Sequence, residues 1–168
     1  MHLLIDGYNL LHIIGSLISP NSVQLQWERD RLINQLSAYQ KVKPCKITVV
    51  FDGWQAGWST EKKESRKGIE LIFSKLGEKA DEVIKRLVKE KGSGAIVVTS
   101  DRDIARYAER MAVSVISSEQ FRKKLEGPTN QFEEVFEEEE EEGGIKKKGL
   151  ARRLSKKEKR ARAALRKL

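Results

Sequence analysis

Four aspartates stand at positions from which their side chains could meet. Asp6, Asp52 and Asp101 each follow the end of a short apolar run. Such runs predict buried strands of a parallel sheet, and the carboxyl ends of those strands lie at one edge. Asp81 opens an amphipathic segment, at the margin of its apolar stripe. We therefore expect the four carboxylates to gather at the carboxyl edge of the sheet, where open α/β sheets bind ligands.

Carboxylates that converge in this way repel one another, and a divalent cation offsets that repulsion. A site made of carboxylates and water suits Mg²⁺ or Mn²⁺. Such ions activate bound water and stabilise the charge on a phosphoryl group in transfer. The formal net charge of +8 indicates a polyanionic partner such as a nucleic acid. The pattern therefore favours hydrolysis of a phosphodiester.

Each aspartate also has a purely structural explanation. Asp6 and Asp52 both precede glycine, and Asp-Gly pairs commonly form turns. Asp81 could stabilise a helix dipole, and Asp101 could cap the helix that follows Ser100. It is the coincidence of acids at three strand ends and one helix start that favours a functional site.

Other polar residues could contact a substrate. Asn9 could orient a water or a phosphate, or merely close its turn, and Asp103 could position a water. Residues 54–67 are predicted to form a mobile loop. Its basic and aromatic side chains could grip the nucleic-acid backbone and stack a base, and they are Lys62, Lys63, Arg66, Lys67, Trp54 and Trp58. An ordinary solvated loop is an equal alternative.

The elements that must position these residues follow from the apolar pattern. Strands are expected at 2–5, 47–51, 69–73, 95–98 and 113–116, and helices at 23–40, 79–91, 104–111 and 119–125. Residues 10–20 could form a short helix or a docked loop, and Ser118 is expected to cap the last helix. Strands that alternate with helices imply an α/β fold with right-handed crossovers and a central parallel sheet of about five strands.

The composition changes after this α/β domain, which we place at residues 1–127. Residues 128–142 contain eight glutamates and no lysine or arginine, and residues 143–168 contain twelve lysines and arginines against one acid. Like-charge blocks are usually disordered or serve as interaction tails. The basic tail has a modest helical pattern. We expect it to bind nucleic acid through cations that include Arg152, Arg153, Lys156 and Lys157.

Several other classes of protein are disfavoured. The single cysteine, Cys45, rules out an internal disulfide framework and fits a reducing compartment. No apolar run approaches the ~20 residues of a membrane helix, and no signal peptide is visible, so we expect a cytoplasmic protein without a membrane partner. No glycine-rich phosphate loop follows the first strand, which argues against a nucleotide-binding Rossmann domain.

Four motifs occur in order over about residues 1–125. They are Ile5-Asp6-Gly7-Tyr8-Asn9, Val50-Phe51-Asp52-Gly53, Gly77-Glu78-Lys79-Ala80-Asp81-Glu82 and Val98-Thr99-Ser100-Asp101. Together they resemble the NYN domain of the PIN-like nuclease superfamily. Within it, they are most similar to the bacterial YacP-like group, which includes a ribosome-associated endoribonuclease.

This resemblance implies a three-layer α/β fold with strand order 3-2-1-4-5, which makes strands 1 and 4 neighbours at the topological switch point. It also implies RNA cleavage dependent on Mg²⁺ or Mn²⁺, with Asp6, Asp81 and Asp101 as the acidic centre. Less certain flanking positions of the motif fall on Asn9, Asp52 and Asp103. Lys79 stands where the family more often has a small hydroxyl residue, and its ammonium could replace some metal charge or contact RNA.

The sequence thus predicts a metal-dependent endoribonuclease that acts on mRNA in association with the ribosome. Two other classes are alternatives: a non-catalytic RNA- or ribosome-binding module that keeps the fold, and a structure-selective DNA nuclease. The residues do not distinguish RNA from DNA, because recognition of the 2′-hydroxyl has no readable motif. They also do not indicate an oligomeric state.

Overall fold

Strands and helices alternate along the chain in the computed structural model, which describes residues 1–14, 22–53, 58–126 and 156–168. The elements are β1 (His2–Asp6), α1 (Gly7–Ile14), α2 (Ser22–Val42), β2 (Lys46–Phe51), β3 (Lys62–Arg66), β4 (Ile69–Phe73), α3 (Ala80–Lys91), the 3-10 turn η2 (Gly92–Gly94), β5 (Ala95–Val98), α4 (Arg102–Arg110), β6 (Ser114–Ile116), α5 (Ser118–Leu125) and α6 (Lys156–Lys167). No described helix is both long enough and apolar enough to cross a membrane.

The strands form one six-stranded sheet in the order β3-β4-β2-β1-β5-β6. All neighbours pair in parallel except β3, which is antiparallel to β4. The five predicted strands are therefore confirmed in the order 3-2-1-4-5. The chain builds outward from β1 to β2 and β4, then crosses to β5 and β6 on the other side. This reversal places the topological switch point between β1 and β5.

The prediction of a loop over 54–67 is wrong for its second half. Residues 62–66 form the edge strand β3, and a tight turn through Lys67 and Gly68, at φ 52° and 81°, leads into β4. Two left-handed residues in succession are typical of the two-residue hairpin turn that matches strand twist. The strand was missed because its side chains are charged or polar, a composition that suits only an exposed edge. Residues 54–57, with Trp54, lie outside the described residues.

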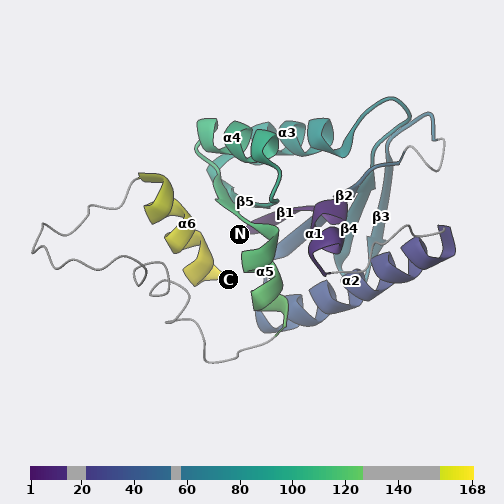
Figure 1. The fold of residues 1–168 in the computed structure, drawn as a ribbon, viewed down its shortest axis with the longest axis horizontal. Coiled ribbons are helices and arrows are strands. Elements are labelled where there is room, and N and C mark those ends of the chain that lie inside the picture. The colour runs from purple at the N-terminus through teal and green to yellow at the C-terminus, as the bar shows by residue number, and fades with distance from the viewer. Residues whose placement is uncertain (15–21, 54–57, 127–155) are drawn as a thin grey trace, which may run out of the picture.

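Helices cover both faces of the sheet and give it three layers (Figure 1). On one face, Leu3, Ile5 and Phe51 belong to a core shared with α1, α2 and α5. On the other face, Leu4 and Val50 pack with α3 and α4. Burial on both faces explains why the strands appear as continuous apolar runs without polar alternation.

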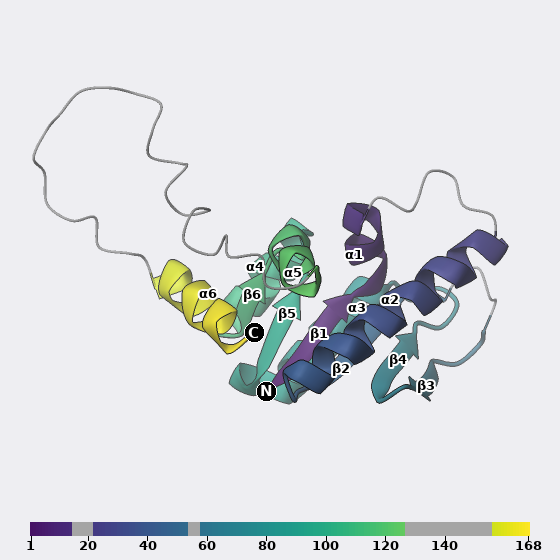
Figure 2. The same ribbon diagram turned by 90° about the horizontal axis from the view of Figure 1, so that it is seen from below.

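The helix indicated by the pattern of the basic tail is present as α6, and it packs on the domain. It lies against β6, the edge strand opposite β3 (Figure 2). Ala164 and Leu168 are each only 3% exposed and join the core on the α2 face. The Tyr39 hydroxyl donates a hydrogen bond of 3.0 Å to the Leu168 carbonyl oxygen. Residues 127–155, with Arg152 and Arg153, lie outside the described residues, as does the side chain of Lys157.

Candidate functional site

Asp6 ends β1 with its side chain only 8% exposed. Its Oδ1 accepts a hydrogen bond of 3.1 Å from the Asn9 backbone N–H, and its Oδ2 accepts one of 3.2 Å from the Thr99 hydroxyl. Gly7, the first residue of α1, lies directly against the Phe51 ring. A Cβ at this position would lie 2.3 Å from that ring, so glycine allows the helix to begin immediately after Asp6. The Asp-Gly pair thus holds a buried carboxylate at the sheet edge.

Asp52 follows β2 and reaches the start of α3. Its Oδ1 accepts a hydrogen bond of 2.6 Å from the backbone N–H of Ala80, the first residue of the helix. Lys79 occupies the N-cap position and makes no capping bond, so Asp52 satisfies a helix N–H in its place. A Cβ at Gly53 would lie 1.9 Å from the Ser74 carbonyl oxygen, so glycine is needed for this close approach. Asp52, predicted near the metal, therefore helps to fix where α3 begins.

Asp81 is the second residue of α3 and is partly buried. Burial is the main cause that raises its pKa, and the charges of Asp101 and Asp52 raise it further. Burial likewise raises the pKa of Asp6 to about 6 and outweighs the opposing hydrogen bonds from Asn9 and Thr99, while the charges of Asp81 and Asp52 raise it by smaller amounts. The structure thus brings these four carboxylates into one repulsive cluster at the carboxyl edge of the sheet.

Asp101 caps α4, as the structural explanation of this residue predicts. Its Oδ1 accepts hydrogen bonds from the backbone N–H groups of Asp103 and Ile104, at 2.8 and 3.0 Å. Both bonds end on one oxygen, so capping does not consume the second one. The Thr99 hydroxyl accepts a 3.0 Å bond from the Asp101 N–H and also donates to Asp6, which links the ends of β5 and β1.

Asp103 points to α3 instead of joining the cluster. Its Oδ2 lies 2.7 Å from the Nζ of Lys85, and that ion pair is the first cause of the lowered pKa of Asp103. To position a water, as the sequence predicts, this carboxylate would have to share its oxygens with the ammonium of Lys85.

Asn9 connects three segments. Its Oδ1 accepts hydrogen bonds from the Ser100 N–H at 2.9 Å and from the Ser118 hydroxyl at 2.7 Å. Sequence reasoning missed this use of Ser118 and was wrong about the helix cap, which is Ser117. Ser117 and Gln120 form a reciprocal capping box, and the Ser-x-x-Gln spacing was the signal that could have identified it.

The predicted basic side chains do not lie together. Lys62 pairs with Phe73 in the ladder, near the acidic edge, and its Nζ lies 4.5 Å from the centre of the Trp58 ring. Arg66 pairs with Ile69 at the opposite end of β3 and forms an ion pair of 3.0 Å with Asp30.

Of the remaining predicted cations, two are held by partners on the protein and one is exposed near the carboxylates. Lys63 pairs with Glu61 at 3.4 Å, and the ammonium of Lys67 donates to the Asn34 side chain. Lys79 is exposed beside Asp81. Only part of the predicted set can therefore reach a substrate at the carboxylates.

The carboxylates fit a hydrated hard cation better than a closed cage. Among the described residues, no three His, Cys, Asp or Glu side chains are arranged to hold one ion directly. Mg²⁺ commonly keeps several waters and uses one or two protein carboxylates. Burial, and to a smaller extent the neighbouring carboxylates, raises the pKa of Asp6 and of Asp81, so a cation at this edge would stabilise their charged forms.

The three-layer fold with carboxylates at its switch point matches the fold of a nuclease-type domain of the PIN-like class. The family model of the YacP-like NYN domain matches residues 3–167, and the chain belongs to this family. The resemblance drawn from the four motifs is thereby confirmed.

Relatives from Bacillus subtilis agree with this assignment. The protein YacP of strain 168 is 33% identical over 114 residues, which are 66% of this chain and 64% of that protein, so the match spans slightly less than two thirds of its length. A crystal structure of Rae1 (YacP), as a point mutant, aligns with a TM-score of 0.62 at 26% identity over 74% of each chain. A second Rae1 (YacP) structure gives 0.57 at 27% identity over 83% of this chain and 79% of that one.

Proposed function

We propose that this protein is a metal-dependent endoribonuclease that hydrolyses RNA phosphodiester bonds, with mRNA at the ribosome as its substrate. The observation that carries the proposal is the meeting of Asp6, Asp81 and Asp101, from three separate elements, at the carboxyl edge of the sheet. Burial raises the pKa of both Asp6 and Asp81, and the charge of Asp81 adds to the first shift and that of Asp101 to the second. Perturbed carboxylates from separate elements at a switch point are typical of a functional site.

Asp6, Asp81 and Asp101 are the residues that would hold one or two Mg²⁺ or Mn²⁺ ions, which when bound supply an activated water and neutralise charge on the phosphate. The protein's own contribution is to keep the three carboxylates in place. Asp6 is held by Asn9 and Thr99, and Asp101 by the first turn of α4. We infer that Lys79 and Lys62, whose ammonium also pairs with Glu64 at 2.5 Å, attract the phosphate backbone near this edge.

Both the positive charge of the protein and its membership of the YacP-like NYN family support a polyanionic substrate. The net charge is +8, and α6 presents exposed cations that include Lys159 and Arg166. The likeness to the YacP-like group, with its ribosome-associated endoribonuclease, supports mRNA and the ribosome. Cytoplasmic location follows from that partner.

The test compares Asp81→Asn with Glu82→Gln, a neighbouring exposed acid on the same helix. Labelled RNA and DNA of one sequence are incubated with each protein, with Mn²⁺ or with chelator, and the RNA is also presented on ribosomes. We expect cleavage of RNA by the wild type and Glu82→Gln with Mn²⁺ only. Asp81→Asn should lose roughly 100-fold or more of the rate, since metal catalysis contributes several kcal/mol.

Other outcomes would identify the alternatives. Tight RNA binding without cleavage under any condition would indicate a binding module. Preferential cleavage of the DNA would indicate a DNA nuclease. Equal cleavage by the wild type and Asp81→Asn would point to a contaminating nuclease and would remove the proposed centre.

A further inference from the structure

The orientation of the Asn9 amide is fixed by a partner that can only donate. The Ser100 backbone N–H lies 2.9 Å from the side-chain atom that faces it. A backbone N–H offers no acceptor, so the facing atom must be the carbonyl oxygen Oδ1 and not the nitrogen. The hydrogen bond alone therefore identifies which of the two amide atoms faces Ser100.

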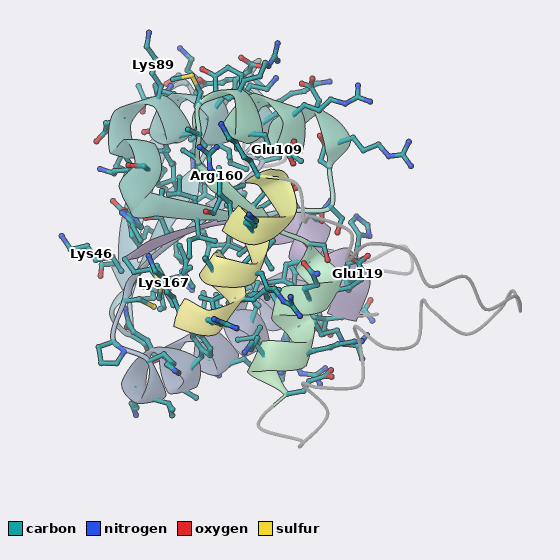
Figure 3. The ribbon with its side chains drawn as sticks, turned by 90° about the vertical axis from the view of Figure 1, so that its left-hand side faces the viewer. Lys46, Lys89, Glu109, Glu119, Arg160 and Lys167 are labelled. Atoms are coloured by element: carbon teal, nitrogen blue, oxygen red, sulfur yellow. The ribbon has the colours of Figure 1, made fainter. Side chains whose placement is uncertain are left out.

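The second lone pair of that oxygen is also used. The Ser118 hydroxyl donates to Oδ1 at 2.7 Å, and Ser118 is fully buried. Its position is itself held, because its backbone N–H donates to the Ser100 hydroxyl at 3.1 Å, and that hydroxyl donates to Glu119 at 2.9 Å. Glu119 lies on α5 (Figure 3), so the network ties this helix to α1 and to the segment between β5 and α4.

An amide oxygen with two hydrogen bonds has no lone pair left for a metal ion. The amide nitrogen keeps two donors, and no hydrogen bond from it is found among the described residues. The side chain is partly exposed, and its own backbone N–H is bonded to Asp6. A donor group therefore stands beside the carboxylates, where an anionic oxygen would be its natural partner.

We propose that the Asn9 amide nitrogen donates a hydrogen bond to a phosphate oxygen of the substrate, and that Ser118 is the positioning residue that holds the amide in this orientation. This inference rests on the proposed function, since it takes the ligand to be an RNA phosphate. It assigns Asn9 the role of a donor, in contrast to a metal ligand. It gives α5 a part in the site, although α5 contributes no member of the carboxylate cluster.

The test uses Ser118→Ala, Ser118→Thr and Asn9→Asp, with Ser117→Ala as a control that weakens α5 without touching Asn9. For each folded variant, kcat, KM and the Mn²⁺ concentration for half activity are measured, together with RNA affinity in chelator. Ser118→Ala should lower kcat/KM and metal-free RNA affinity by roughly tenfold, the scale of one lost hydrogen bond. Its Mn²⁺ requirement should be unchanged, and Ser118→Thr should restore the wild-type values.

Asn9→Asp provides the sharper comparison. A carboxylate at residue 9 has no N–H and repels a phosphate, so it should reduce RNA affinity more than Ser118→Ala does. If Asn9→Asp instead stays active with a lower Mn²⁺ requirement, residue 9 is a metal ligand and the inference is overturned. It is also overturned if Ser117→Ala matches Ser118→Ala, because both then act through the stability of α5. RNA affinity in chelator reads the Asn9 contact even if the wild type does not cleave, so failure of the nuclease proposal remains distinguishable.

Discussion

Asp6 is a carboxylate whose surroundings disfavour its charged form. It is buried beside Asp81 and Asp52, and its pKa rises from 3.8 to about 6. The folded protein therefore binds the Asp6 proton more tightly than the unfolded chain does. Below about pH 4 this difference stabilises the fold fully, and the contribution is lost as the pH rises through about 6.

We predict that Asp6→Asn relieves this loss in the absence of divalent ions. Between pH 5 and pH 8 the wild type should lose about 1.4 kcal/mol of stability relative to Asp6→Asn, because part of the contribution is already lost between pH 4 and pH 5. The asparagine keeps an oxygen to accept the Asn9 N–H. Urea unfolding in chelator at both pH values measures the difference, with Glu82→Gln as a control for an exposed acid. Identical pH dependence of the wild type and Asp6→Asn would contradict the raised pKa.

At this scale the sequence was informative about which acids matter and not about their partners. Asp6, Asp52 and Asp101 could be predicted because each stands at the end of a recognisable apolar run. The contact between Asn9 and Ser118 spans 109 positions of the chain. No local pattern encodes a hydrogen bond of that separation, so Ser118 was assigned instead to the helix cap one residue away from the true one.

Among the elements, α3 depends on a side chain from another strand. Asp52 accepts the Ala80 N–H because Lys79 cannot cap the helix. The start of α3, and with it the position of Asp81, is thus fixed from β2. Loss of the Asp52 hydrogen bond should therefore both destabilise the start of α3 and displace Asp81 from the other carboxylates.

We predict that Asp52→Ala costs about 1 kcal/mol of stability, the usual cost of a lost helix cap. Cleavage should fall with it, because Asp81 is no longer held. Adding Lys79→Ser to this variant supplies a hydroxyl at the N-cap position and should recover most of the lost stability. Urea unfolding and Mn²⁺-dependent cleavage of both variants measure this. A double variant no more stable than Asp52→Ala would show that Asp52 does not act as the cap.

The five parallel strands could be predicted from their buried aliphatic residues, and β3 could not. Its sequence, Lys62 to Arg66, is stabilised by backbone pairing with β4, while its side chains face solvent or pair with acids. Periodicity detects an element through the face that it buries. A charged edge strand buries almost none and is therefore invisible to that argument.

At the scale of the whole molecule, α6 is both a carrier of exposed cations and a part of the packed domain, whereas the sequence predicted only a basic, partly helical tail. The tail is strongly basic, yet Ala164 of α6 and Leu168, which follows the helix, are buried in the core. Figure 3 shows α6 across the edge of the sheet, with Arg160 close to Glu109 of α4, and both residues line one cavity. The exposed cations of α6 are therefore held in a fixed direction relative to the domain.

We predict that the exposed cations of α6 contribute to RNA binding. Replacing Lys159, Arg166 and Lys167 by glutamine should reduce the slope of log affinity against log salt by roughly 2, since each phosphate contact contributes about 0.7 for single strands. The free energy of unfolding should not change. The control replaces Lys41, Lys46 and Lys89, which are exposed on elements other than α6, and it removes the same charge. Equal slopes for the two triple variants would show that only net charge matters.

The docking of α6 against β6 has a further consequence, for how molecules of this protein meet one another. A sheet ends in strands whose unused backbone groups can recruit another chain and begin fibril growth. In the part of the chain that the structure describes, one outer strand is guarded by the lysines and arginine of β3 and the other lies beneath α6. The helix that presents cations to solvent thus also covers an edge strand that could otherwise pair with another chain.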